Sequence, residues 1–216
     1  MNCIVTAGPT CEPLDDVRRL TNFSTGRLGT ELANFLTASG HTVTLLVGES
    51  ATWPGERKAQ KIKIFSSTKD LRAKLKSFSG QKVDAIFQAA AVSDFSFGKI
   101  FMRDANGRLT PFKRTKKIST RGGNLFAELV PTPKIIAELR GWYPRTRIIG
   151  WKFEADGQRA DAVRAARQQI ADCSTDACVA NGPAYGKGFG LITASGQKHF
   201  ADAQKLFAAL ENRIKE

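Results

Sequence analysis

The sequence predicts an α/β fold: a modified Rossmann-like, mostly parallel sheet with helices on both faces and a β-hairpin arm. Three observations support this. Short apolar β-type runs alternate with segments of helical periodicity, which is typical of a parallel sheet covered by helices. The first run ends in a glycine turn, Gly8-Pro9-Thr10. In the middle of the chain, Asn106-Gly107 interrupts an alternating segment and predicts a hairpin turn of type I′.

The elements of the N-terminal half follow from these patterns in order. Apolar β-type runs predict strands at Asn2–Ala7, Thr42–Val47, Lys61–Phe65 and Ala85–Gln88. Apolar residues at helical spacing predict helices over Arg27–Ser39 and about Lys69–Phe78. Gly40 is expected to end the first helix, because glycine adopts the left-handed conformation that commonly closes helices.

The C-terminal half begins with the arm, a hairpin over Lys99–Pro111 that is expected to lie outside the main sheet. The elements that follow are a strand at Leu125–Val130, a helix opened by Pro133 that runs to Leu139, strands at Arg147–Phe153 and Ala177–Asn181 around an alanine-rich helix at Arg159–Ala171, a second hairpin over Gly188–Phe200 and a closing amphipathic helix at Ala201–Ile214. No repeat or linker interrupts them, so we expect a single domain over residues 1–216.

Composition excludes several classes of protein. The 216 residues are 42% hydrophobic and 25% charged, which favours one globular domain over disorder. No apolar run reaches about 18 residues, and the chain opens without a signal-peptide pattern, so we expect a cytoplasmic protein that does not enter the membrane. The four cysteines have no metal-ligand spacing and are expected to be reduced thiols, so we name no metal ligands.

The chain is basic, with a formal net charge of +13 and a pI of about 9.9, which attracts anions of any kind. A generally cationic surface explains this balance slightly better than a dedicated patch does. The densest basic stretch consists of Lys113, Arg114, Lys116, Lys117 and Arg121. Nucleic acid is not favoured as a partner, because no recognised nucleic-acid-binding motif is present.

The loop after the first strand predicts a phosphate site. In a doubly wound sheet, ligands bind beyond the carboxyl ends of the strands, and a helix N-terminus there offers free N–H groups to phosphate. Ser24 and Thr25 add hydroxyl donors. The expected phosphate-binding residues are Gly8, Pro9, Thr10, Ser24, Thr25 and Gly26. A capped helix with a packing glycine is an equally simple explanation of this turn.

Two further clusters are expected at the same edge. Ala90, Ala91 and Asp94 follow the strand at 85–88, where small residues would let a planar base or sugar lie against the backbone. Asp94 could accept a hydrogen bond from a ligand, help to hold a metal ion or cap a helix or turn. The second cluster, Lys116-Lys117-Ile118-Ser119, ends the arm and supplies lysines within reach of a phosphate site.

Taken together, these residues resemble the phosphopantothenoylcysteine synthetase (phosphopantothenate–cysteine ligase) family. The most specific block is TAGPTCEPLD at 6–15, followed by Val17-Arg18 and LTNFSTG at 20–26. The weaker pieces that continue the resemblance are AAVSDF at 90–95, KKIS at 116–119, PKII at 133–136, IGWKF at 149–153 and VAN at 179–181. Many family members are fused to a flavin decarboxylase, for which this chain has no room, so it looks like the stand-alone form.

The resemblance implies a ligase of coenzyme A biosynthesis. A nucleoside triphosphate, CTP or ATP, would activate the carboxylate of 4′-phosphopantothenate as an acyl-nucleotide with release of pyrophosphate. The amine of cysteine would then displace the nucleotide. The resemblance further implies Mg²⁺, a homodimer and CTP in preference to ATP. Two alternatives stay open: a non-catalytic nucleotide- or nucleic-acid-binding module, and an NADP-dependent reductase, although GxGxxG and Tyr-x-x-x-Lys are both absent.

The resemblance also implies residue roles. Asn22 matches the asparagine that holds the acyl-nucleotide, Arg18 matches a charge and positioning residue, and Lys117 matches the lysine that stabilises charge as the acyl-nucleotide forms. Lys113 or Lys116 could take the role of Lys117. The family stretch GFAAET is GWKFEA at 150–155, and its bulkier side chains leave the nucleotide preference open.

Overall fold

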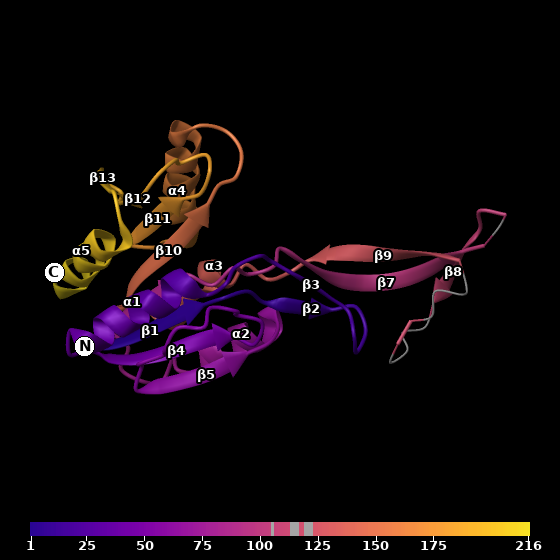
Figure 1. Cartoon of the computed structure of the whole chain (residues 1–216), viewed down its shortest axis with the longest axis horizontal. Coiled ribbons are helices and arrows are strands. Elements are labelled where there is room, and N and C mark those ends of the chain that lie inside the picture. Colours follow the sequence, from indigo (N-terminus) through magenta and orange to yellow (C-terminus); the bar gives the residue numbers. More distant parts are fainter. Residues whose placement is uncertain (105, 113–116, 119–122) are drawn as a thin grey trace.

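The computed structural model describes residues 1–104, 106–112, 117–118 and 123–216. Its centre is an eight-stranded sheet (Figure 1). The strands, in their order across the sheet, are β13 (Gln197–Phe200), β12 (Phe189–Ile192), β11 (Ala177–Asn181), β10 (Arg147–Phe153), β6 (Ala85–Gln88), β1 (Asn2–Ala7), β4 (Thr42–Gly48) and β5 (Lys61–Phe65). The six strands from β11 to β5 are parallel, and β12 and β13 add an antiparallel edge.

Five helices cover both faces of this sheet. They are α1 (Arg27–Ala38), α2 (Thr68–Ser77), α3 (Ile135–Trp142), α4 (Arg159–Cys173) and α5 (Ala203–Lys215). Helices α1 and α5 pack on one face, and α2, α3 and α4 contribute to the buried clusters of the other. Numbered along the chain, the six parallel strands have the order 3-2-1-4-5-6, which is the Rossmann arrangement. The predicted fold class is therefore confirmed.

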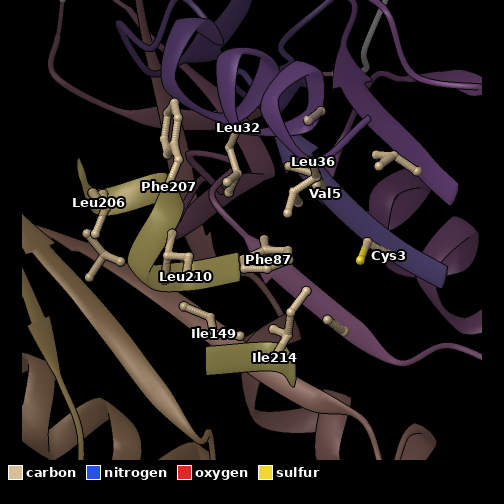
Figure 2. Close-up of a cluster of buried hydrophobic side chains, with 14 of the residues drawn as sticks. Cys3, Val5, Leu32, Leu36, Phe87, Ile149, Leu206, Phe207, Leu210 and Ile214 are labelled. Atoms are coloured by element: carbon tan, nitrogen blue, oxygen red, sulfur yellow. The ribbon is translucent and has the colours of Figure 1, made fainter. Parts of the chain in front are cut away.

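The larger core lies between the sheet and helices α1 and α5. Val5, Phe87 and Ile149 project from neighbouring strands toward Leu32 and Phe207, and all five side chains are buried (Figure 2). Strands β1, β4 and β6 read as nearly continuous apolar runs because a parallel sheet buries both of its faces. Burial of an apolar side chain of this size contributes about 1.5–3 kcal/mol.

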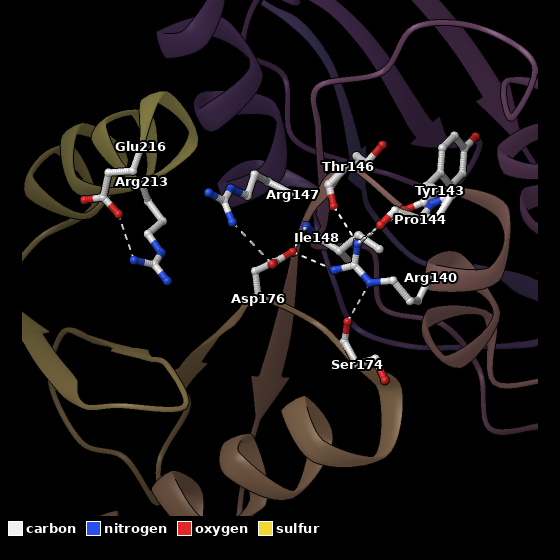
Figure 3. A network of polar contacts seen from close by, with 10 residues as sticks. All are labelled: Arg140, Tyr143, Pro144, Thr146, Arg147, Ile148, Ser174, Asp176, Arg213 and Glu216. Atoms are coloured by element: carbon white, nitrogen blue, oxygen red, sulfur yellow. Dashed lines mark hydrogen bonds and ion pairs between the residues drawn. The ribbon is translucent and has the colours of Figure 1, made fainter.

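Arg140, near the end of α3, joins three parts of the second face (Figure 3). Its guanidinium donates to the carboxylate of Asp176 at 2.7 Å. It also donates to four backbone carbonyls, those of Tyr143, Pro144, Thr146 and Ser174. The planar, five-donor guanidinium can reach all of these acceptors at once. This hub fixes the start of β10 against the end of α4.

Two small sheets extend from one end of the main sheet (Figure 1). A two-stranded ribbon pairs β2 (Cys11–Pro13) with β3 (Arg19–Thr21). The arm is a three-stranded sheet of order β8-β7-β9, with β7 (Phe95–Arg103), β8 (Leu109–Phe112) and β9 (Asn124–Pro131). The prediction of a hairpin arm was therefore incomplete, because the strand expected at 125–130 completes the arm rather than the main sheet.

The arm turn corrects another expectation. A type I′ turn needs positive φ at both central residues. Gly107 has φ 83°, but its N–H donates to the Asp104 carbonyl at 3.0 Å, so the turn does not have Asn106 and Gly107 as its two central residues. Instead, the Asp104 N–H donates to the Arg108 carbonyl at 3.1 Å, and the Asp104 carboxylate accepts from the N–H groups of Asn106 and Arg108. The aspartate side chain stabilises a longer loop than the Asn-Gly pair predicts.

The remaining boundaries agree to within a few residues. The hairpin of β12 and β13 and the closing helix α5 form as predicted. Helix α3 runs from Ile135 to Trp142, later than the predicted span from Pro133 to Leu139. In the part of the chain that the structure describes, no helix is both long enough and apolar enough to span a bilayer.

Candidate active site

The candidate site lies where the strand order reverses, between β1 and β6. These strands are parallel neighbours, with Cys3 opposite Ala85 and Thr6 opposite Gln88, so their carboxyl ends meet. The loops that follow continue the pairing: the Ala91 N–H donates to the Gly8 carbonyl at 3.0 Å, and the Thr10 N–H donates to the Ala91 carbonyl at 3.1 Å. The two loops predicted to share one edge are therefore bonded to each other.

Gly8 and Gly26 bring three stretches of backbone into contact. Both have left-handed φ, 79° and 81°. A Cβ added to Gly8 would lie 2.8 Å from the Cβ of Ala51, and one added to Gly26 would lie 3.0 Å from that atom and 3.3 Å from the Gly8 Cα. The sequence left both glycines open to two explanations, phosphate binding and packing. In the structure, they are first required for the approach of chain to chain.

Helix α1 begins directly after Gly26, which is its N-cap and provides no side-chain hydrogen bond. The Thr25 hydroxyl accepts from the Arg27 N–H at 3.3 Å, whereas Ser24 lies half-buried beside it. The N–H groups of Leu28 and Gly29 have no hydrogen-bond partner among residues 1–104 and the other described segments. The helix start therefore retains donors and a partial positive charge that suit an anion.

Asn22 stands between this helix start and the β6 loop. Its Nδ2 donates to the Ala91 carbonyl at 3.1 Å, so that carbonyl accepts from both Asn22 and Thr10. The side chain is exposed, and its Oδ1 has no partner in the described part of the chain. The hydrogen bond fixes the amide beside the loop that carries Ala90 and Ala91, with its oxygen available to a ligand.

Thr10 and Pro9 lie in the predicted loop after β1 but are not exposed there. Both residues are buried, and Thr10 is fully so. The Thr10 hydroxyl oxygen accepts from the Ser93 N–H at 2.9 Å and from the Thr68 hydroxyl at 3.1 Å. Thr10 therefore holds the β1 loop, the β6 loop and α2 together, and presents no surface to a ligand. The sequence predicts Thr10 among the phosphate-binding residues, and in the structure its hydroxyl bonds within the protein.

The small residues after β6 lie at the expected edge. The Ala90 N–H donates to the Thr6 hydroxyl at 3.0 Å, and Ala90 and Ala91 are both half-buried. Asp94 is exposed, directly before β7, and its backbone carbonyl accepts from the Thr132 N–H at 2.9 Å. Among the described residues its carboxylate caps no helix, and its predicted role toward a ligand, a metal ion or a turn stays a prediction.

A buried carboxylate links Arg18 to Ile118, the residue after Lys117. Asp15, in the loop between β2 and β3, accepts from the Arg18 guanidinium and from the Ile118 N–H at 3.0 Å. Arg18 in turn donates to the Ile118 carbonyl at 2.7 Å. The Arg18 guanidinium holds the pKa of Asp15 well below its usual range, helped by the Ile118 N–H. Lys113 and Lys116, the alternative lysines, lie outside the described residues.

The cysteines take no part in this site. All four are free and buried. Burial raises the pKa of the Cys3 thiol to about 11 and that of the Cys178 thiol to about 12, which disfavours the nucleophilic thiolate.

Two residues near the site were missed by the sequence analysis. Gln88, the last residue of β6, is 5% exposed, and neither polar atom of its side-chain amide has a hydrogen-bond partner among the described residues. The second is Asp15, whose burial and contacts with a residue about a hundred positions away leave no local signal in the sequence. In the segments that the structure describes, no group of three or more His, Cys, Asp or Glu could hold a metal ion.

The fold and the site together define a Rossmann-like protein whose first helix begins, with unbonded N–H donors among the described residues, at the strand-order reversal. The chain belongs to the DNA/pantothenate metabolism flavoprotein C-terminal domain family, whose model matches residues 1–215. It is 35% identical over 178 residues to the coenzyme A biosynthesis bifunctional protein CoaBC of Thermococcus kodakarensis, covering 82% of this chain and 40% of that protein. It is 30% identical over 203 residues to the Bacillus subtilis protein of the same name, covering 94% and 45%.

Solved structures agree with the family. The DNA/pantothenate metabolism flavoprotein from Streptococcus pneumoniae superposes with a TM-score of 0.85 at 25% identity, over 100% of this chain and 98% of that one. A Cab2 mutant in complex with phosphopantothenate-cysteine superposes with a TM-score of 0.75 at 18% identity, over 99% and 86%. The second likeness shows the fold. The chain spans less than half the length of the two curated relatives described above.

Proposed function

We propose that this protein is a phosphopantothenate–cysteine ligase. In the first step, a carboxylate oxygen of 4′-phosphopantothenate attacks the α-phosphorus of a nucleoside triphosphate and pyrophosphate leaves. In the second, the cysteine amine attacks the acyl carbon, the nucleoside monophosphate leaves and the amine loses a proton. The mixed anhydride is needed because a free carboxylate has no adequate leaving group.

The observation that carries this proposal is the position of Asn22 in a member of this family. Its amide is bonded to the Ala91 carbonyl at the strand-order reversal, next to the start of α1. A donor and an acceptor fixed there suit the acyl-phosphate junction of an acyl-nucleotide. The solved Cab2 mutant complex, which contains phosphopantothenate-cysteine, supports the same product class for this fold.

Under this proposal, some groups of the site bind phosphate or stabilise its charge, and Arg18 positions its neighbours. The N–H groups of Leu28 and Gly29, with the helix dipole, would bind phosphate oxygens. Lys117 would stabilise the charge that develops as pyrophosphate leaves. Arg18 is committed to Asp15 and to the Ile118 backbone, which supports a positioning role rather than direct phosphate binding.

The site fits a nucleotide-borne magnesium ion. Mg²⁺ keeps most of its coordination from water and substrate phosphates and needs only one or two protein carboxylates. Asp94 offers one exposed carboxylate at this edge. Bound there, Mg²⁺ would neutralise phosphate charge that otherwise repels the incoming carboxylate. We further propose CTP rather than ATP, which rests on the family resemblance and not on a base contact.

The arm supports a homodimer. Phe95, Leu109, Phe126 and Leu129 on its three strands are between 39% and 51% exposed. A small sheet that projects from the main core with exposed apolar side chains is typical of an association surface (Figure 1). We propose that a second copy of the chain covers it. The four free cysteines favour a reducing compartment, which supports the cytoplasm.

The direct test is pyrophosphate release from the purified protein with Mg²⁺ and 4′-phosphopantothenate, comparing CTP with ATP, with and without cysteine. Release that requires 4′-phosphopantothenate is expected, faster with CTP. Without cysteine, the acyl-nucleotide should accumulate on the enzyme and be detectable by mass spectrometry. A folded dimer that releases no pyrophosphate with either nucleotide would refute the ligase function.

Two variants test the residue roles. Asn22→Ala is expected to impair consumption of the acyl-nucleotide, and Lys117→Ala is expected to impair its formation, each by about 10–1,000-fold, as for other lost transition-state donors. Lys69→Ala, on the exposed side of α2, is the matched control and should keep wild-type turnover. Wild-type turnover in both active-site variants would show that the roles are assigned to the wrong residues.

A further inference from the structure

Asp15 is a buried carboxylate in an otherwise exposed loop. Its side chain is 0% exposed, while its neighbours Asp16 and Val17 are exposed. The Asp15 Oδ1 accepts from the N–H of Val17 at 3.0 Å and from that of Arg18 at 2.7 Å. These two bonds close the loop at residues 15–18 through Oδ1, so Oδ2 is available to accept other hydrogen bonds.

Through Oδ2, Asp15 binds Ile118, a residue about a hundred positions later in the chain. The Asp15 Oδ2 accepts from the Ile118 N–H at 3.0 Å, and the Arg18 Nη2 donates to the Ile118 carbonyl at 2.7 Å. The Arg18 Nε closes the group by donating to the same Oδ2 at 3.0 Å. Both polar groups of one peptide residue are thus bound by side chains, and the Ile118 side chain is 2% exposed. We call this group the Asp15 clamp.

By holding Ile118, the clamp also holds the backbone of the preceding residue, Lys117, in place. The Cα atoms of Lys117 and Ile118 are about 3.8 Å apart, as in any trans peptide. Strand β3, Arg19–Thr21, connects the clamp residue Arg18 to Asn22. Four residues of extended chain between Arg18 and Asn22 span roughly 13 Å. The ribbon therefore carries Asn22 at its base and holds Lys117 near its tip.

We propose that Asp15 is a positioning residue for the first chemical step, acting through Arg18 and the Ile118 backbone to place Lys117. This inference rests on the proposed ligase function, and it adds a residue with no contact to substrate. An asparagine in place of Asp15 keeps the shape but turns one of its two acceptors into a donor. In one amide orientation that donor would face the Arg18 guanidinium and the Ile118 N–H, and in the other it would face the backbone N–H groups of Val17 and Arg18. Both orientations leave donors without their acceptor and weaken the clamp.

The test compares the full-length wild type with Asp15→Asn, Lys117→Ala and the double variant. Pre-steady-state pyrophosphate release without cysteine reports formation of the acyl-nucleotide. Asp15→Asn should slow it about 10–100-fold, the cost of misplacing a catalytic group by about 1 Å. Adding Asp15→Asn to Lys117→Ala should cost less than about twofold more, because a lysine that is absent cannot be misplaced further. Asp16→Asn, the exposed neighbour, is the matched control and should change nothing.

A second measurement does not depend on activity. Amide hydrogen exchange at Ile118 should accelerate at least about tenfold in Asp15→Asn, because its N–H loses its acceptor, while peptides from β1 and β6 keep their wild-type exchange. Asp15→Glu, which restores two acceptor oxygens, should recover part of the protection and part of the rate.

The outcomes separate the two proposals. An active wild type with a normal rate in Asp15→Asn, or with fully additive losses in the double variant, overturns the positioning role. Unchanged exchange at Ile118 overturns the clamp itself. A wild type without pyrophosphate release refutes the ligase function and with it the catalytic purpose of the clamp, even where faster exchange in Asp15→Asn upholds the contact.

Discussion

Replacing Thr10 by valine tests whether this residue joins the two loops of the site. The Thr10 hydroxyl oxygen accepts from the Ser93 N–H and from the Thr68 hydroxyl, both buried. Valine has nearly the same shape and accepts neither. Leaving a buried donor unpaired costs about 1–3 kcal/mol. Because the Thr68 hydroxyl can rotate and recover part of its loss, we expect the free energy of unfolding to fall by about 2–4 kcal/mol.

Thr10→Ser is the matched control, because it keeps the oxygen and removes one methyl group at a cost of about 1 kcal/mol. Urea unfolding followed by tryptophan fluorescence, at one protein concentration, measures both variants. The m-value should not change, since the native surface is preserved. Valine no more destabilising than serine would show that the hydroxyl does not bridge the loops and would refute this account of Thr10.

Three further predictions concern stability and are measured by the same unfolding assay. Gly29→Ala should lower stability by about 1–3 kcal/mol despite its better helix propensity, because its Cβ would lie 2.7 Å from the Thr6 carbonyl oxygen. Gly141→Ala, where a Cβ meets nothing within 4 Å, should instead be neutral or stabilise by up to about 1 kcal/mol; equal effects would contradict the packing argument. Arg140→Lys should cost about 2–3 kcal/mol, because three donors on a point charge cannot serve four carbonyls and a carboxylate, and wild-type stability would rule the hub out. The pKa of Asp15 is lowered in the folded protein, so its stabilising contribution is complete above its unfolded value of about 4 and is lost as the pH falls through the lower folded value. Stability curves from pH 7 to pH 2 should therefore be shallower for Asp15→Asn, and identical slopes would contradict the lowered pKa.

The main sheet could be predicted from the sequence because its signals are local. Strands such as Thr42–Gly48 read as apolar runs bounded by turns, and helix α1 has its apolar residues at helical spacing. These patterns follow from burial on both faces of the sheet and on one face of a helix, and they need no knowledge of the partner.

The arm was harder, because its third strand is separated from its partner in sequence. Residues 124–131 pair with β7 rather than with the main sheet, and β-type periodicity cannot say which sheet a strand joins. Likewise, the Asn106-Gly107 pair predicts a type I′ turn, whereas the side chain of Asp104 stabilises a longer loop.

The sequence by itself determined the fold class, the family resemblance and the segments that carry the site. Its turn glycines, its periodicity and motifs such as LTNFSTG, which contains Asn22, are all local features of the chain. Only the tertiary structure decided what each residue does there. It showed that the Thr10 hydroxyl is a buried link between loops, that Gly26 packs against Gly8, and that Asp15 is bonded to Ile118. The physical reason is that burial and hydrogen-bond partners depend on residues distant in sequence, which local patterns do not encode.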